Sequence, residues 1–346
     1  MRGGVTAPLR LRLDTAALTD NWRALARMSG GAACGAAVKA NGYGLGATTV
    51  ATRLAEAGCR DFFVATWAEA ERLAPLRLPA LAVLHGVRDE DMALAASGIA
   101  RPVLGTPQQV ARWRAAGGGA CDVMVDTGMN RLGVSPDAVR AGLLDGLAID
   151  TLHSHLACAD EDHAMNAAQR DAFAALRGAT TARRMALANS AGIALGSGYH
   201  FDLTRPGVAL YGGIPRAEFA GVIRQVAYPE AQILQRRTVP AGETVGYNAT
   251  WTAARDTEVA ILNLGYADGY RRAFSDRGSA GGGTLPVIGR VSMDLVALDV
   301  TADPALVEGD WVTLDYALPE AAARSGVSQY ELLTGLGRRF VKPQDA

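Results

Sequence analysis

The segment AAVKANGYGLGA, residues 36–47, places a lysine between a short apolar run and a glycine-rich turn. A lysine held in a partly apolar setting is poorly hydrated, which lowers its pKa and favours the neutral amine. A neutral amine can form a Schiff base with an aldehyde. Lys39 is therefore a candidate for covalent chemistry, although a surface lysine at the end of a strand would show the same local pattern.

The glycines after Lys39 do not match the common nucleotide-binding loops. Their spacing is G-x-G-x-G, whereas a dinucleotide loop has G-x-G-x-x-G. Asp61 stands at about the distance of a ribose-binding acid, but it precedes the next apolar run instead of ending it. No Gly-Lys-Ser/Thr follows the glycines, so a phosphate loop is not indicated either.

Two histidines in the segment TLHSHL, His153 and His155, are two residues apart. On a strand they would project from the same face, where they could bind a metal ion. No second cluster of histidines or cysteines would complete a metal shell. His85, His163 and His200 are expected to be structural or exposed.

These residues stand within a regular alternation of apolar and helical segments. After a strand-like LRLRLD and a helix from about Thr15 to Met28, eight short apolar runs follow between Ala32 and Gly207. Alanine-rich helical patterns separate them. This alternation predicts an α/β fold of parallel βαβ units. Eight units suggest a closed (β/α)8 barrel of the TIM type, in which Lys39 would lie at the active-site end of the first strand.

Beyond about Tyr228 the pattern changes to strand-like runs separated by Gly, Pro and Asp turns. Helix signals nearly vanish until the segment SQYELLTGLGRRF. We therefore expect a barrel domain over residues 10–227 and a mostly β domain over residues 228–346. The strand at about residues 1–13 could pair with this second domain.

Composition excludes several classes of function. The 346 residues include 34 basic and 35 acidic side chains, and the pI is near 6.5, so no electrostatic footprint for nucleic acid or a membrane surface is present. No stretch is apolar and long enough to span a bilayer, and no signal peptide is apparent. The four cysteines contain no Cys-x-x-Cys pair, which favours buried thiols in a reducing compartment. A soluble cytoplasmic protein is expected.

The segment AVKANGYGLGA resembles the cofactor-lysine signature of alanine racemases, fold-type III enzymes that use pyridoxal 5'-phosphate (PLP). Eight further segments resemble blocks of that family in the family's order: VDTGMNRLG, SHLACADE, LANSAG, RPGVALYG, VGYNATW, GYADGYRR, GRVSMD and YELLTGLGRR. Together they cover the chain from about Leu11 to Arg339. The family's fold is a (β/α)8 barrel followed by a β domain, in agreement with the pattern of elements.

The resemblance implies that Lys39 carries PLP as a Schiff base and acts as the base on one face of an amino-acid substrate. Tyr247 would act on the other face, from the second subunit, so that a homodimer with composite active sites is implied. An ordinary tyrosine is a poor base at neutral pH. The family pattern places His155 against this tyrosine and Arg205 against His155, which would favour the phenolate.

The resemblance also assigns the remaining site residues, and no metal ligand is among them. Arg205 would donate to the pyridine nitrogen of PLP and keep the ring neutral, because arginine cannot accept a proton. The groups implied to bind the phosphate are Tyr43, Ser190, Gly207, Val208 and Tyr330. The groups implied to bind or border the substrate are Arg131, which would also lie near the PLP phenolic oxygen, and, from the second subunit, Met293, Tyr266 and Asp294.

Three positions depart from the family pattern. Met124 stands where several relatives have a carbamylated lysine that orients the active-site arginine, so Arg131 must be oriented by another side chain, water or an anion. Leu45 stands where many relatives have histidine. Asn248 stands where glycine is commoner after the catalytic tyrosine, a change that could alter the entrance or the substrate preference.

The leading interpretation is alanine racemisation, which supplies D-alanine for peptidoglycan or degrades it. A racemase of the same family with broader or serine specificity is a second. A non-catalytic PLP-binding homeostasis protein is a third, but such relatives are single barrels. A PLP-dependent decarboxylase is a fourth. It would need a cysteine motif from the partner subunit, whereas all four cysteines lie in the barrel half.

Overall fold

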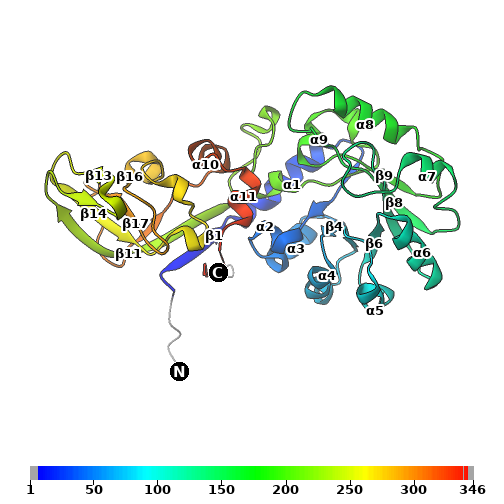
Figure 1. Cartoon of the computed structure of the whole chain (residues 1–346), viewed down its shortest axis with the longest axis horizontal. Coiled ribbons are helices and arrows are strands. Elements are labelled where there is room, and N and C mark those ends of the chain that lie inside the picture. Colours follow the sequence, from blue (N-terminus) through cyan, green and yellow to red (C-terminus); the bar gives the residue numbers. More distant parts are fainter. Residues whose placement is uncertain (1–6, 338, 342–346) are drawn as a thin grey trace. The chain divides into compact units, whose positions relative to one another are not determined.

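The computed structural model describes residues 7–337 and 339–341. The chain divides into two compact units (Figure 1). One unit comprises Thr15–Arg224. The other comprises Gln225–Ala346 together with Met1–Asp14.

The first unit is built on seven parallel strands in sequential order, β3 to β9. Every neighbouring pair of this sheet is parallel, as βαβ connections require. The strands are β3 (Ala36–Ala37), β4 (Asp61–Val64), β5 (Ala80–Val83), β6 (Arg101–Leu104), β7 (Cys121–Met124), β8 (Ile149–His153) and β9 (Arg184–Ala186).

The ring closes through an eighth strand position. β10 (Leu203–Thr204) pairs in parallel with β2 (Ala33–Cys34), the segment directly before β3. On the other side of β10, the N–H of Asp202 donates to the carbonyl of Met185 in β9 at 3.0 Å. The predicted (β/α)8 barrel is therefore confirmed, and all eight predicted strand segments contain strands.

Gly35, between β2 and β3, allows the first strand to lie very close to β4. A Cβ at this position would lie 2.8 Å from the carbonyl oxygen of Asp61 and 2.8 Å from the ring of Phe63. Only a residue without a side chain allows the two strands to approach this closely.

The helices of the barrel unit lie around the outside of the strands, as Figure 1 shows for α3 to α6. They are α1 (Thr15–Met28), α3 (Ala47–Glu56), α4 (Trp67–Leu73), α5 (Met92–Ala96), α6 (Pro107–Ala115), α7 (Pro136–Arg140), α8 (Ala164–Ala174) and α9 (Ser190–Ala194). The segment α2 (Lys39–Tyr43) contains left-handed residues and is a turn. Leu18, Trp22 and Leu25 of α1 are buried at helical spacing, so α1 presents one apolar stripe to the barrel.

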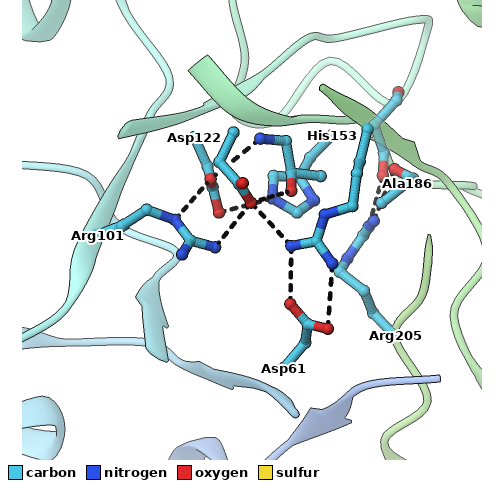
Figure 2. A network of polar contacts seen from close by, with 10 residues as sticks. Asp61, Arg101, Asp122, His153, Ala186 and Arg205 are labelled. Carbon is cyan, nitrogen blue, oxygen red and sulfur yellow. Dashed lines mark hydrogen bonds and ion pairs between the residues drawn. The ribbon is translucent and has the colours of Figure 1, made fainter. Parts of the chain in front are cut away.

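The barrel interior contains an apolar layer and a charged layer. Six side chains form the apolar layer: Phe63, Ala82, Val103, Met124, Ala186 and Leu203. The charged layer comes from residues at or near the starts of the strands: Asp61, Arg101, Asp122, Asp150 and Arg184 (Figure 2). Because parallel strands start at the same end of a barrel, this ion network lies away from the ends where Lys39 and its neighbours follow the strands.

The second unit is a mostly antiparallel β structure. Its sheet has the order β1–β11–β14–β17–β16–β15, and β18 also pairs with β11. The strands of the unit are β1 (Leu9–Leu13), β11 (Ala227–Val239), β12 (Thr244–Val245), β13 (Trp251–Thr252), β14 (Thr257–Leu262), β15 (Ser279–Ala280), β16 (Leu285–Ile288), β17 (Val296–Asp299) and β18 (Trp311–Thr313). Its helices are α10 (Leu318–Ser325) and α11 (Gln329–Thr334).

The N-terminal strand belongs to this second unit. β1 runs antiparallel to β11, with Leu9 opposite Ala231 and Leu13 opposite Ala227. Residues 1–6 of the segment expected at about 1–13 lie outside the described residues. Within the described part of the chain, no helix combines the length and apolar composition that crossing a bilayer requires.

Candidate active site

Five of the predicted site residues follow the carboxyl ends of five different barrel strands. Lys39 follows β3, Arg131 follows β7, His155 follows β8, Ser190 follows β9 and Arg205 follows β10. The carboxyl ends of the strands meet at one end of a barrel, which is where barrel enzymes place their active sites. The fold thus brings these residues, far apart in sequence, to one region.

The chain makes an unusual turn directly after Lys39. Ala40, Asn41, Gly42 and Tyr43 have φ values of 52°, 55°, 62° and 53°, a run of left-handed residues. For residues with a side chain this conformation costs roughly 1–2 kcal/mol each. The turn is held by hydrogen bonds, among them one from the N–H of Ala47 to the side chain of Asn41 at 3.0 Å. Backbone strain that is maintained in this way is typical of functional sites.

Lys39 is half-buried and lies within the field of two arginines. Burial lowers its pKa most, Arg131 and Arg205 lower it further, and Glu69 acts in the opposite direction. Burial and the charges of the two arginines therefore favour the neutral amine. The structure therefore gives Lys39 the electrostatic setting that a Schiff-base lysine needs.

Arg205 is buried and fixed by two backbone carbonyl groups. Its guanidinium donates to Ala186 and to Ser154, each at 2.6 Å, and Figure 2 shows it against the end of β9. Burial lowers its pKa to about 10, and the charge of Asp122 opposes this shift. Arg205 consequently remains protonated at neutral pH.

His155 is neutral in this setting. Burial, followed by the charges of Arg205, Arg131 and Lys39, lowers its pKa to about 3. All four side chains follow the carboxyl ends of barrel strands, so their charges act in one region. A neutral imidazole can pass a hydrogen bond between a donor and an acceptor without adding a further positive charge.

The sequence analysis did not single out Gln169, which holds the His155 loop. Its amide donates to the carbonyl of His155 at 2.9 Å and accepts from the N–H of Ala157 at 2.9 Å. Gln169 lies on α8 four residues before Phe173, and both side chains are fully buried. A glutamine on the apolar face of a helix must find hydrogen-bond partners, and this spacing could have revealed it.

Asp126, also not singled out, forms the turn that carries Arg131. One carboxylate oxygen accepts from the N–H groups of Gly128 and Asn130, and the other accepts from the N–H of Arg131 at 3.1 Å. The Arg131 side chain is exposed. Met124, the residue in place of the family's carbamylated lysine, packs in the apolar layer of the barrel. Asp126 thus fixes the backbone of Arg131, whereas the lysine of the family stands at position 124.

A group of hydroxyl and amide donors lies beside this cationic region. The hydroxyl oxygen of Ser190 accepts from the N–H of Gly207 at 2.8 Å and of Ala209 at 3.2 Å. Tyr43 stacks on Tyr211 with ring centroids 4.7 Å apart. A Cβ added to Gly207 would lie 2.2 Å from the Tyr43 hydroxyl oxygen. Ser190, Gly207 and Tyr43 therefore meet at the start of the 3-10 helix Val208–Tyr211.

This donor set fits a phosphorylated aldehyde such as PLP. Because the Ser190 oxygen already accepts two N–H groups, its own proton is available to an anion. Backbone amides at the start of a helical turn also favour an anion. The lack of a side chain at Gly207 leaves room for the Tyr43 hydroxyl. Lys39 would bind the aldehyde, and Arg131 and Arg205 add positive charge for anionic groups.

The other predicted site residues lie in the second unit. Tyr247 and Met293 are 65% and 53% exposed, although both are large and largely apolar. The turn of Tyr266 contacts the Met293 loop, because the N–H of Ala267 donates to the carbonyl of Met293 at 3.0 Å. Asp294, next in the chain, forms an ion pair with Arg339. Tyr330 is on α11, in the same unit, with its side chain partly exposed.

Asn248 and Leu45 both suit their places in the fold, the first by its backbone conformation and the second by its burial. Asn248 has a φ of 63°, in the left-handed region that glycine adopts most readily and that asparagine tolerates better than most residues. Leu45 is 1% exposed and belongs to the core. The two departures are thus compatible with the backbone beside Tyr247 and in the glycine turn.

His153 and His155 have different surroundings. His153 is fully buried with Asp122, whose carboxylate lies 3.2 Å from Nε2. Burial keeps the pKa of His153 below its usual value, so the imidazole is neutral. Among the described residues, no group of three His, Cys, Asp or Glu side chains could hold a metal ion.

Comparison with known proteins identifies the family. Residues 13–215 match the alanine racemase N-terminal domain family, and residues 226–343 match the alanine racemase C-terminal domain family. The chain belongs to the alanine racemase family. An alanine racemase of Acidiphilium cryptum is 44% identical over 95% of this chain and 97% of its own. A catabolic alanine racemase of Agrobacterium fabrum is 44% identical, covering 95% of this chain and 90% of the relative. A biosynthetic alanine racemase of the same organism is 40% identical over 96% and 93%.

Solved structures agree with this assignment. Alanine racemase from Bartonella henselae, with covalently bound pyridoxal phosphate, is 32% identical and superimposes with a TM-score of 0.88 over 97% of this chain and 99% of that chain. Biosynthetic alanine racemase from Pseudomonas aeruginosa is 32% identical, with a TM-score of 0.88 over 99% of this chain and the whole of that one. The predicted family and the predicted barrel-plus-β architecture are both confirmed.

Proposed function

We propose that this protein interconverts L-alanine and D-alanine with PLP as its cofactor. The observation that carries the proposal is the cluster of Lys39, Arg131, His155 and Arg205 at the carboxyl ends of the barrel strands, beside the donor group of Ser190, Gly207 and Tyr43. The family and its near relatives support the substrate. The structural relative with covalently bound pyridoxal phosphate supports the cofactor.

PLP, when bound, would supply an electron sink that acidifies the Cα–H of the amino acid joined to it. Lys39 would hold the cofactor through its amine and then take or give the proton at Cα on one face. The lowered pKa of Lys39, caused by burial and by Arg131 and Arg205, suits a group that must accept a proton near neutral pH.

Inversion requires a second base on the opposite face, because one base alone returns the proton to the same side. Tyr247 of the partner subunit is the proposed second base, which makes the active unit a homodimer. The high exposure of Tyr247 and Met293 supports this assignment, because large apolar side chains that a single subunit leaves exposed can be buried against a partner. The partner subunit would also contribute Met293, Tyr266 and Asp294.

Four further roles follow for the other site residues. Ser190, Tyr43 and the amides of Gly207 and Val208 would bind the phosphate, with Tyr330 as an additional hydroxyl. Arg205 would direct one of its three remaining N–H groups to the pyridine nitrogen, because the two backbone carbonyls use only two of its five donors. Arg131 would bind the substrate carboxylate, and neutral His155 would connect Arg205 with Tyr247.

The test is to follow the circular dichroism of L-alanine and, separately, of L-serine after adding PLP-loaded protein. Decay of the L-alanine signal to zero with the amino acid itself conserved is the expected result. Decay with L-serine alone would move the specificity and contradict alanine as the substrate. Absence of decay with both would overturn the proposed racemase.

Lys39→Ala provides the control for that experiment. The variant should lose both the visible absorption of lysine-bound PLP and the racemisation. A variant that kept both would contradict the role of Lys39.

A further inference from the structure

We propose that Glu69 is a positioning residue for Lys39, which fixes the strained turn behind the lysine from the neighbouring helix. Glu69 lies on α4, thirty positions further along the chain, and neither the sequence motifs nor the proposed roles include it. The inference concerns the lysine of the proposed function, but the contact on which it rests is independent of the substrate.

The two carboxylate oxygens of Glu69 accept hydrogen bonds from different parts of the chain. Oε2 accepts from the N–H groups of Ala65 and Thr66 at 2.8 and 3.2 Å. The N–H of Glu69 in turn donates to the hydroxyl of Thr66, which completes a capping box at the start of α4. Oε1 is not needed for the cap. It accepts from the N–H of Ala40 at 2.6 Å.

Ala40 is the first left-handed residue after Lys39. An alanine adopts this conformation only when the surroundings determine it. The bond from Ala40 to a carboxylate is charge-assisted and short, so it is stronger than an ordinary hydrogen bond. Glu69 therefore anchors the peptide that joins Lys39 to the turn, and with it the direction in which the lysine side chain leaves the strand.

The negative charge of Glu69 also affects the pKa of Lys39. Burial, Arg131 and Arg205 lower the pKa of Lys39, and Glu69 opposes them. One side chain thus combines the helix cap, the turn and the charge at the lysine. A misplacement of a reacting group by about 1 Å can cost on the order of 100-fold in rate.

The chemistry of glutamine allows the cap and the anchor to be separated. In Glu69→Gln the single amide oxygen can continue to accept from Ala65 and Thr66, while the NH2 group faces the N–H of Ala40. The anchor to Ala40 is lost and the cap is retained. Thr66→Val is the converse variant, because it removes the capping hydroxyl and leaves both carboxylate oxygens in place. Glu71→Gln, an exposed position on the same helix, is the matched control for the loss of charge.

The experiment measures hydrogen–deuterium exchange of the PLP-loaded full-length protein, together with kcat and KM for alanine. Glu69→Gln should speed exchange in peptides covering residues 38–47 and lower kcat about tenfold, with KM nearly unchanged. Thr66→Val should speed exchange at the start of α4 and lower the thermal midpoint, with wild-type kcat. Glu71→Gln should match wild type throughout.

Two results would overturn the inference. One is unchanged exchange over 38–47 together with an unchanged kcat in Glu69→Gln. The other is an equal loss of kcat in Thr66→Val, which would mean that the cap alone matters. If the wild-type protein did not racemise alanine, the proposed function would fail, whereas the exchange measurement would still decide whether Glu69 anchors the turn.

Discussion

Arg205 donates a 2.6 Å hydrogen bond to the carbonyl oxygen of Ser154, the residue directly before His155. Its second terminal nitrogen donates to Ala186, so the guanidinium joins the ends of β8 and β9. Arg205 therefore fixes the backbone at His155 as well as lowering its pKa. A positively charged side chain and a planar fork of donors are both needed for these two effects.

Arg205→Lys should show that charge alone is insufficient. A lysine ammonium is a point charge that cannot reproduce the paired geometry of the guanidinium, so at least one buried carbonyl would lose its partner. We expect the free energy of unfolding to fall by about 1–3 kcal/mol, measured by urea denaturation. Arg140→Lys, at an exposed pair with Asp137, is the control and should change little. Equal stability of the two variants would contradict the assigned role.

His155 should make the protein less stable in weak acid. Its folded pKa is about 3, below the ordinary value of 6.5, because of burial and the charges of Arg205, Arg131 and Lys39. Between these two values the unfolded chain binds one proton more than the folded chain. The free energy of unfolding therefore falls as the pH is lowered from about 6.5 toward 3, by at most about 1.4 kcal/mol per pH unit for this group.

The measurement is urea denaturation at several pH values for wild type and His155→Asn. The variant should show a shallower fall below pH 6.5. His85→Gln, at an exposed histidine, should retain the wild-type slope. An identical slope in wild type and His155→Asn would contradict the lowered pKa.

The fold could be predicted largely from local patterns, and the charged interior could not. The helix Thr15–Met28 agrees with the sequence to the residue, because an apolar stripe and a following glycine pair mark it. The runs that became strands were visible as short apolar segments between alanine-rich helical patterns. The pairing of Asp122 with His153 was hidden, since it depends on the register between β7 and β8, which shifts between Cys121 and Val123.

The residues that support the site were also hard to predict, because their contacts depend on the folded chain. Lys39 and its glycine turn were recognisable because their residue types form a motif. Glu69, Asp126 and Gln169 act by accepting or donating hydrogen bonds to backbone groups that are distant or in tight turns. Only the last of them left a periodic signal in the sequence.

Tyr247→Phe should separate the two directions of proton transfer. Removing the phenolic hydroxyl abolishes the proposed base on one face and leaves Lys39 on the other. We expect PLP to remain bound and α-proton exchange in deuterated water to slow on the order of 100-fold or more for one enantiomer of alanine. The other enantiomer should keep exchanging without inversion, as measured by NMR. Equal mild losses for both enantiomers would argue against two bases.

Arg339 holds two acidic side chains in the second unit. Asp268 is fully buried, and both of its oxygens lie within 2.8 Å of the Arg339 guanidinium. The same guanidinium pairs with Asp294. Asp268 also accepts from the N–H of Gly265 at 3.0 Å, and a Cβ on Gly265 would lie 2.2 Å from the carbonyl oxygen of Met293. The C-terminal segment thus stabilises the turn that packs against the Met293 loop.

Arg339→Ala should therefore be costly although the arginine lies at the surface. It leaves a buried carboxylate with a single backbone donor, which is expected to reduce the free energy of unfolding by about 2 kcal/mol. Arg255→Ala is the matched control, because Arg255 forms one ion pair with Asp299 in the same unit and an exposed pair contributes at most about 1 kcal/mol. Urea denaturation of both variants decides the point, and a smaller loss for Arg339→Ala than for Arg255→Ala would refute it. If the Met293 loop contributes to the substrate site as proposed, Arg339→Ala should also raise KM for alanine, whereas Arg255→Ala should leave KM unchanged.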